Sequence, residues 1–214
     1  MKDMNTRLIR KLQSLDGVKL VAVTKKHTKE EIDELHALGL DTFGENRVQE
    51  FLEKYDPAYH WHIIGHLQTN KVKYLMGKVD LIESVDSLKL AQEIEKQAAK
   101  AGIVQNILVE IHISKTDENK TGLPVEDLPR LLEEISRMPH LCLKGLMCIA
   151  SLTDDRERNA EEFDEMKSLF DHYKTIYPTM DTLSMGMSAD WETAVAHGSN
   201  QIRVGSALFA SEED

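Results

Sequence analysis

The sequence predicts an α/β protein built as a single closed barrel of eight parallel strands, the (β/α)8 or TIM barrel. Short apolar runs recur about eight times along the 214 residues, and segments with helical periodicity separate many of them. No linker or low-complexity stretch divides the chain, so residues 1–214 are expected to form one domain. A doubly wound open sheet is the alternative architecture for the same alternation.

Eight runs rich in apolar and β-branched residues are expected to form the strands. In chain order they are KLVAVTK (19–25), DTFGEN (41–46), HWHIIG (60–65), LIESVD (81–86), ILVEIHI (107–113), LKGLMCIA (143–150), TLSMG (182–186) and QIRVG (201–205). Helical periodicity is found before the first run and between later ones. The helical segments are 1–15, Glu30–Leu38, Leu88–Ala101, Val125–Arg137, Asn159–Tyr177 and Ala189–His197.

Composition narrows the class of protein. The net charge of -11 disfavours binding to nucleic acid or to anionic lipid over most of the surface, so any anion site must be local. No apolar run approaches the ~20 residues that span a bilayer, and the N-terminus has no apolar signal core, which together favour a cytoplasmic protein. Cys142 and Cys148 have neither disulfide-framework nor zinc spacing, so reduced thiols and no metal are expected.

Active sites of parallel barrels lie at the carboxyl ends of the strands, where Lys25 ends the first run. Strand alternation places Val21, Val23 and Lys25 on one face, so Lys25 lies at the barrel mouth if that face is internal. A lysine amine forms a Schiff base only when neutral, which requires its ordinary pKa of ~10.4 to be lowered by desolvation or by cations such as Lys26. Taken alone, such a lysine is usually a solvated surface residue.

Two segments of small residues near the C-terminus are candidates for binding a phosphate. Barrels often bind phosphate in the loops after strands seven and eight. Gly186 ends the seventh run and Ser188 follows it, while Gly205 ends the eighth run and Ser206 follows that one. Glycine lets the backbone approach an anion closely, and a serine hydroxyl adds a donor. Each segment alone is also compatible with an ordinary helix-capping turn, but two at the expected places favour a phosphate site.

Arg203 lies within the eighth run, where its permanent charge requires a partner or an opening to solvent. If Ile202 and Val204 face the helices, Arg203 faces the barrel interior near Lys25. There it would donate to a pyridine nitrogen, keep that nitrogen unprotonated and weaken the electron sink of the ring. The alternative is a structural ion pair with a strand carboxylate, namely Glu45, Glu83 or Glu110. The combination of Schiff-base lysine, phosphate site and arginine suggests bound pyridoxal 5'-phosphate.

Seven segments follow a recognisable pattern in order from the first strand to the last. They are VAVTK, FGENRVQE, WHIIGHLQTNK, ENKTG, GLMCIA, LSMGMSADWETAVAHGS and RVGSALF. Because these segments extend over almost the whole chain, the sequence as a whole resembles the pyridoxal phosphate homeostasis protein family. That family has the fold of the alanine racemase N-terminal domain. The resemblance implies that Lys25 is the Schiff-base lysine and that Arg203 faces the pyridine nitrogen. It further implies phosphate binding by Ser188, Gly205 and Ser206. Asn46 and Met147 would line the pocket.

The resemblance implies a protein that holds pyridoxal phosphate reversibly and buffers it or supplies it to pyridoxal phosphate-dependent apoenzymes, without robust catalysis. One alternative is a weak amino acid racemase. Racemases of this fold use a second, β-rich domain and a dimer partner, and they typically need acid and base groups on both faces of the Schiff base. This chain is expected to lack that domain and to be a monomer, and beyond Lys25 it shows no tyrosine or cysteine motif for the second face. A Schiff-base aldolase acting on a sugar phosphate is the other alternative.

Overall fold

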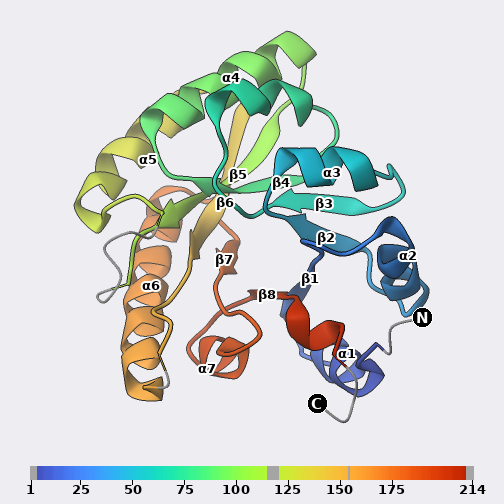
Figure 1. Cartoon of the computed structure of the whole chain (residues 1–214). Coiled ribbons are helices and arrows are strands. Elements are labelled where there is room, and N and C mark those ends of the chain that lie inside the picture. Colours follow the sequence, from blue (N-terminus) through green and yellow to red (C-terminus); the bar gives the residue numbers. More distant parts are fainter. Residues whose placement is uncertain (1–3, 115–120, 154, 211–214) are drawn as a thin grey trace.

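The computed structural model, which describes residues 4–114, 121–153 and 155–210, is a closed barrel (Figure 1). Eight parallel strands pair in chain order, and the last pairs with the first. The strands are β1 (Lys19–Val23), β2 (Thr42–Glu45), β3 (His60–Ile63), β4 (Leu81–Val85), β5 (Gln105–Ile111), β6 (Leu141–Cys148), β7 (Thr182–Ser184) and β8 (Gln201–Val204). Closure confirms the predicted barrel and excludes the open-sheet alternative.

Helices surround the ring of strands (Figure 1). The α-helices are α1 (Thr6–Gln13), α2 (Lys29–Ala37), α3 (Val48–Lys54), α4 (Leu88–Ala101), α5 (Leu128–Ser136), α6 (Arg156–Ile176) and α7 (Trp191–Ala196). Three short 3-10 helices are η1 (Thr69–Tyr74), η2 (Val125–Asp127) and η3 (Ser206–Leu208). None of the helices in the described part of the chain combines the length and the apolar character that crossing a bilayer requires.

The main apolar core lies between the barrel and the helices. Strand residues of the outward-facing set, such as Ala22, Phe43 and Trp61, are fully buried in it. Burial of each large apolar side chain contributes roughly 1.5–3 kcal/mol, so this layer supplies most of the driving force for folding. The barrel interior holds a much smaller apolar cluster around Leu108 and Met147 and also contains buried polar side chains, such as Glu83, Ser184 and Arg203. The interior is therefore the place where buried polar chemistry is concentrated.

Candidate functional site

Lys25 follows β1 directly, at the carboxyl end of the barrel. Ala22 belongs to the apolar core outside the barrel, whereas Val21 and Val23 do not, as strand alternation predicts. Lys25 is exposed and has no ion pair with any residue that the structure describes. Its amine is therefore accessible to a ligand at the mouth.

The two small-residue segments near the C-terminus meet at one place. Gly205 N donates to Ser188 Oγ at 3.3 Å, and Ser206, which follows, is exposed. Gly205 also packs on β1, because a Cβ at this position would lie 3.0 Å from Val23 Cβ. The structure therefore joins the candidate phosphate residues into one surface, beside the strand that leads to Lys25.

Gly186 is needed for the path of the loop after β7. Its φ of +99° lies in the left-handed region, and a Cβ would stand 2.7 Å from Ala194 Cβ on α7. Gly186 O accepts a hydrogen bond from Arg203 N at 2.9 Å, and Met187 N donates to Asp190 Oδ1 at 2.6 Å. These contacts place Ser188 close to the end of β8.

Arg203 lies in the barrel interior, as predicted, because Ile202 and Val204 are both in the outer apolar core. It is 3% exposed. Its Nη1 donates to Ser184 Oγ at 2.6 Å and its Nη2 to Cys148 O at 2.8 Å. A guanidinium has five N–H donors, so these two bonds to described residues leave donor capacity for a ligand.

Of the three strand carboxylates that the sequence offers as ion-pair partners of Arg203, the structure shows Glu83. Arg203 Nη1 lies 3.9 Å from Glu83 Oε2, and Ser184 Oγ donates to that same oxygen at 2.6 Å. Glu83 Oε1 contacts His62 Nδ1 at 2.7 Å and accepts a hydrogen bond from Gln201 Nε2 at 2.9 Å. Burial alone would raise the pKa of Glu83, but its contacts with His62, Arg203 and Ser184 outweigh burial and hold that pKa below its usual value.

Met147 and Asn46 occupy different places, the first in the barrel interior and the second directly after β2. Met147 is fully buried on β6 and pairs in register with Ser184, so it lies beside the Arg203 network. Asn46 follows β2, and its Oδ1 is buried without a hydrogen-bond partner among the described residues. A Cβ on Gly65 would lie 2.5 Å from Asn46 O, so only glycine allows this approach. The orphaned amide oxygen is a polar group that a ligand at the mouth would satisfy.

Two further carboxyl groups lie on the same side of the barrel as Met147. Glu110 is on β5, in register with Met147, and Asp86 directly follows β4. Glu110 is 2% exposed, and its Oε1 accepts a hydrogen bond from Thr121 Oγ1 at 2.7 Å. Burial raises the pKa of Glu110 and also that of Asp86, against the opposing charge of His66. Burial therefore favours the protonated, uncharged form of both carboxyl groups.

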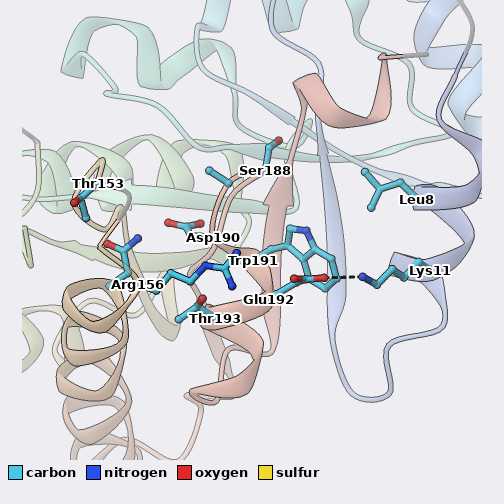
Figure 2. Close-up of a pocket in the computed structure, with 11 residues that line it drawn as sticks. Leu8, Lys11, Thr153, Arg156, Ser188, Asp190, Trp191, Glu192 and Thr193 are labelled. Atoms are coloured by element: carbon cyan, nitrogen blue, oxygen red, sulfur yellow. Dashed lines mark hydrogen bonds and ion pairs between the residues drawn. The ribbon is translucent and has the colours of Figure 1, made fainter. Parts of the chain in front are cut away.

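A cavity of about 430 Å³ adjoins Ser188 between α1, α6 and α7. Figure 2 shows Arg156 extending from α6 toward Asp190 and Thr193, while Lys11 of α1 pairs with Glu192 at 2.6 Å. Lys25 does not line this cavity. The cavity thus neighbours the phosphate residues without including the reactive lysine.

The chain matches the model of the family described as alanine racemase, N-terminal domain, over residues 3–213. It is 42% identical over 200 residues to a pyridoxal phosphate homeostasis protein of Aquifex aeolicus, an alignment that covers 91% of this chain and 87% of that one. The chain belongs to the pyridoxal phosphate homeostasis protein family. The Escherichia coli member of that name is 35% identical over 94% of this chain and 88% of its own.

Solved structures agree with this membership of the pyridoxal phosphate homeostasis protein family. PipY of Synechococcus elongatus, solved with pyridoxal phosphate bound, superposes with a TM-score of 0.88 at 33% identity, covering 95% of this chain and 98% of that one. A D-threonine aldolase of Filomicrobium marinum superposes with a TM-score of 0.81 at 18% identity and shares the fold alone. The superposition covers 95% of this chain but only 58% of the aldolase.

Sequence reasoning missed most of the polar interior and the support behind Lys25. His62 and Gln201 on the strands complete the Arg203 network, and Lys54 on α3 contacts the turn after β1. The signal for His62 and Gln201 was a polar residue at every second position of an apolar run, which marks an interior face. The sequence gives no indication that Lys54 is buried, because a lysine at the end of a helix is ordinarily exposed to solvent.

Proposed function

We propose that this chain binds pyridoxal 5'-phosphate reversibly as a Schiff base on Lys25, and that it buffers the cofactor or supplies it to pyridoxal phosphate-dependent apoenzymes. One observation carries the proposal. The exposed Lys25 follows the strand on which the joined Ser188–Gly205 surface packs. The pyridoxal phosphate bound to PipY and the name shared by the relatives support the choice of ligand.

Each residue has a proposed part in holding the cofactor. The cofactor supplies an aldehyde that condenses with an amine and a pyridine ring that accepts electron density. Lys25 provides the amine, and the Ser188 hydroxyl with the backbone at Gly205 and Ser206 binds the phosphate. Arg203 donates to the pyridine nitrogen through a guanidinium already fixed by Ser184 and Cys148. Asn46 and Met147 line the remaining sides.

The proposal includes the absence of robust catalysis. A guanidinium keeps its proton, so donation from Arg203 leaves the pyridine nitrogen unprotonated and weakens the ring as an electron sink. The racemase alternative requires acid and base groups on both faces of the cofactor, and only Lys25 has a proposed place there. We further propose that residues 1–214 act as one domain, as a monomer and in the cytoplasm.

The test is an absorbance titration with pyridoxal phosphate, followed by borohydride reduction and peptide mapping. We expect a visible band in the wild type, absent in Lys25→Ala and kept in Lys26→Ala, and a reduced label on the Lys25 peptide. A colourless wild type, or label scattered over surface lysines, would contradict the proposal and favour the sugar-phosphate aldolase. Racemisation of L-alanine by catalytic amounts of protein would contradict the absence of robust catalysis.

A further inference from the structure

The turn that carries Lys25 has an unusual backbone. Thr24 O accepts a hydrogen bond from His27 N at 3.0 Å, which closes a four-residue turn with Lys25 and Lys26 at its centre. Lys26 has a φ of +66° and is the only non-glycine residue with positive φ in the described part of the chain. This left-handed conformation costs roughly 1–2 kcal/mol for an L residue with a side chain. Contacts from outside the turn must therefore hold it.

Glu50 on α3 provides the contact to the strained residue. Lys26 N donates to Glu50 Oε2 at 3.0 Å. This hydrogen bond is the main reason that the pKa of Glu50 lies below its usual value, so Glu50 is an anion at neutral pH. Lys54 Nζ lies 3.6 Å from the same oxygen and favours that charge. The backbone N–H that the left-handed conformation turns toward α3 thus meets a charged acceptor.

Lys54 fixes the start of the same turn. Its Nζ donates to Thr24 O at 2.9 Å and to Glu45 Oε1 at 2.8 Å, and its side chain is only 10% exposed. Thr24 Oγ1 donates to Glu45 Oε1 at 2.6 Å. The buried side chains of Lys54 and Glu45 therefore enclose the residue before Lys25. Thr24, Glu45, Glu50 and Lys54, which we name the turn clamp, hold the backbone on both sides of Lys25.

We propose that Glu50 is a positioning residue for Lys25, holding Lys26 in its left-handed conformation so that the Lys25 amine is directed at the aldehyde of the cofactor. This inference rests on the proposed function. In the step that it favours, the Lys25 amine, neutral after its proton has passed to solvent, adds to the aldehyde carbon. A C=N bond forms and the aldehyde oxygen leaves as water. A turn held before binding removes an ordering cost from this step.

The test compares two ligands that share ring and phosphate. Pyridoxine 5'-phosphate carries an alcohol in place of the aldehyde, so it occupies the site without condensing with an amine. We expect Glu50→Ala to bind pyridoxal phosphate roughly tenfold more weakly, the effect of losing one hydrogen bond to a charged group, with unchanged affinity for pyridoxine 5'-phosphate. Glu50→Gln, which keeps an acceptor, should recover part of the loss. Glu53→Ala is the control, because Glu53 is an exposed carboxylate of the same helix.

Two outcomes would overturn the inference. One is unchanged pyridoxal phosphate affinity in Glu50→Ala, and the other is an equal loss for both ligands, which would mean a general structural effect. Exchange of the Lys26 amide hydrogen tests the clamp without any ligand. We expect exchange at least about tenfold faster in Glu50→Ala than in the wild type, and equal rates would refute the clamp. Failure of the proposed function has a different signature: Lys25→Ala would bind pyridoxal phosphate as tightly as the wild type does.

Discussion

Arg203 has structural contacts in the empty protein in addition to its proposed contact with the cofactor. Its guanidinium is buried and held by Ser184, by Cys148 O and by the charge of Glu83. Removing one partner of a buried ion pair leaves the other charge uncompensated, which is usually more costly than replacing both. Arg203 is therefore expected to support the fold of the empty protein as well as any bound cofactor.

A double-mutant cycle measures this structural role. We expect Arg203→Ala to lower the free energy of unfolding by roughly 3 kcal/mol, since buried Glu83 loses one of the partners that stabilise its charge. The same change in a Glu83→Gln background should cost clearly less. Urea unfolding of the four proteins without cofactor gives the coupling energy. Equal costs in the two backgrounds would show that Arg203 and Glu83 do not interact.

Glu110 predicts a dependence of stability on pH. Because burial raises its pKa in the folded state, its favourable contribution is complete below the unfolded value of ~4.3 and is lost as pH rises through the folded value. Glu110→Gln does not titrate and keeps an acceptor for Thr121. The stability of the variant relative to the wild type should therefore increase as the pH rises from 4 to 7. Urea titrations at the two pH values check this, and a constant difference would contradict it.

At the scale of elements, β6 depends on one glycine. Gly145 has a φ of +150°, and a Cβ there would lie 1.7 Å from Thr182 O on β7. The neighbouring strand backbone would have to move, and β6 carries Met147 while β7 carries Ser184. The close approach of these two strands thus underlies the interior network.

Gly145→Ala should accordingly be strongly destabilising, by roughly 3 kcal/mol or more, because backbone overlap cannot be relieved by a rotamer change. Gly77→Ala is the matched control. Gly77 also has a positive φ, of +75°, but a Cβ added there would have no described atom within 4 Å, so only the conformational cost of roughly 1–2 kcal/mol applies. Similar losses in urea unfolding for both variants would argue against the steric explanation.

The sequence predicted the elements that are long or strongly patterned. The strands and the helices α1, α2, α4, α5, α6 and α7 agree with the predicted segments, most of them within a few residues, whereas α3 and η1 were not predicted. For the candidate site, the sequence pattern selects Lys25, Arg203 and the small-residue loops, and their binding roles stay predictions. Local sequence pattern cannot identify the partners of Arg203, because they come from distant parts of the chain. Glu83 and Ser184, which contact each other and Arg203, are 101 positions apart.

At the scale of the whole molecule, ring closure predicts cooperative unfolding. Each strand depends on two neighbours, so no half of the barrel retains a complete sheet alone. We expect far-UV circular dichroism and tryptophan fluorescence to give coincident urea transitions. Trp191→Phe leaves Trp61, a buried residue of β3, as the reporter for the opposite side. Two separated transitions would instead show two independently unfolding units.

Closure also sets an order of events during synthesis on the ribosome. β1 pairs with β8 from Lys19 and Gln201 to Ala22 and Val204, so about 180 residues must emerge before one edge of β1 finds its partner. At ~5–20 residues per second, this edge stays open for roughly 10–40 s. The surface at Gly205, which packs on Val23, arrives with the same late segment. A nascent chain therefore exposes Lys25 long before β8 and the Gly205 surface are in place, and we expect it to retain a cofactor only after that segment has been made.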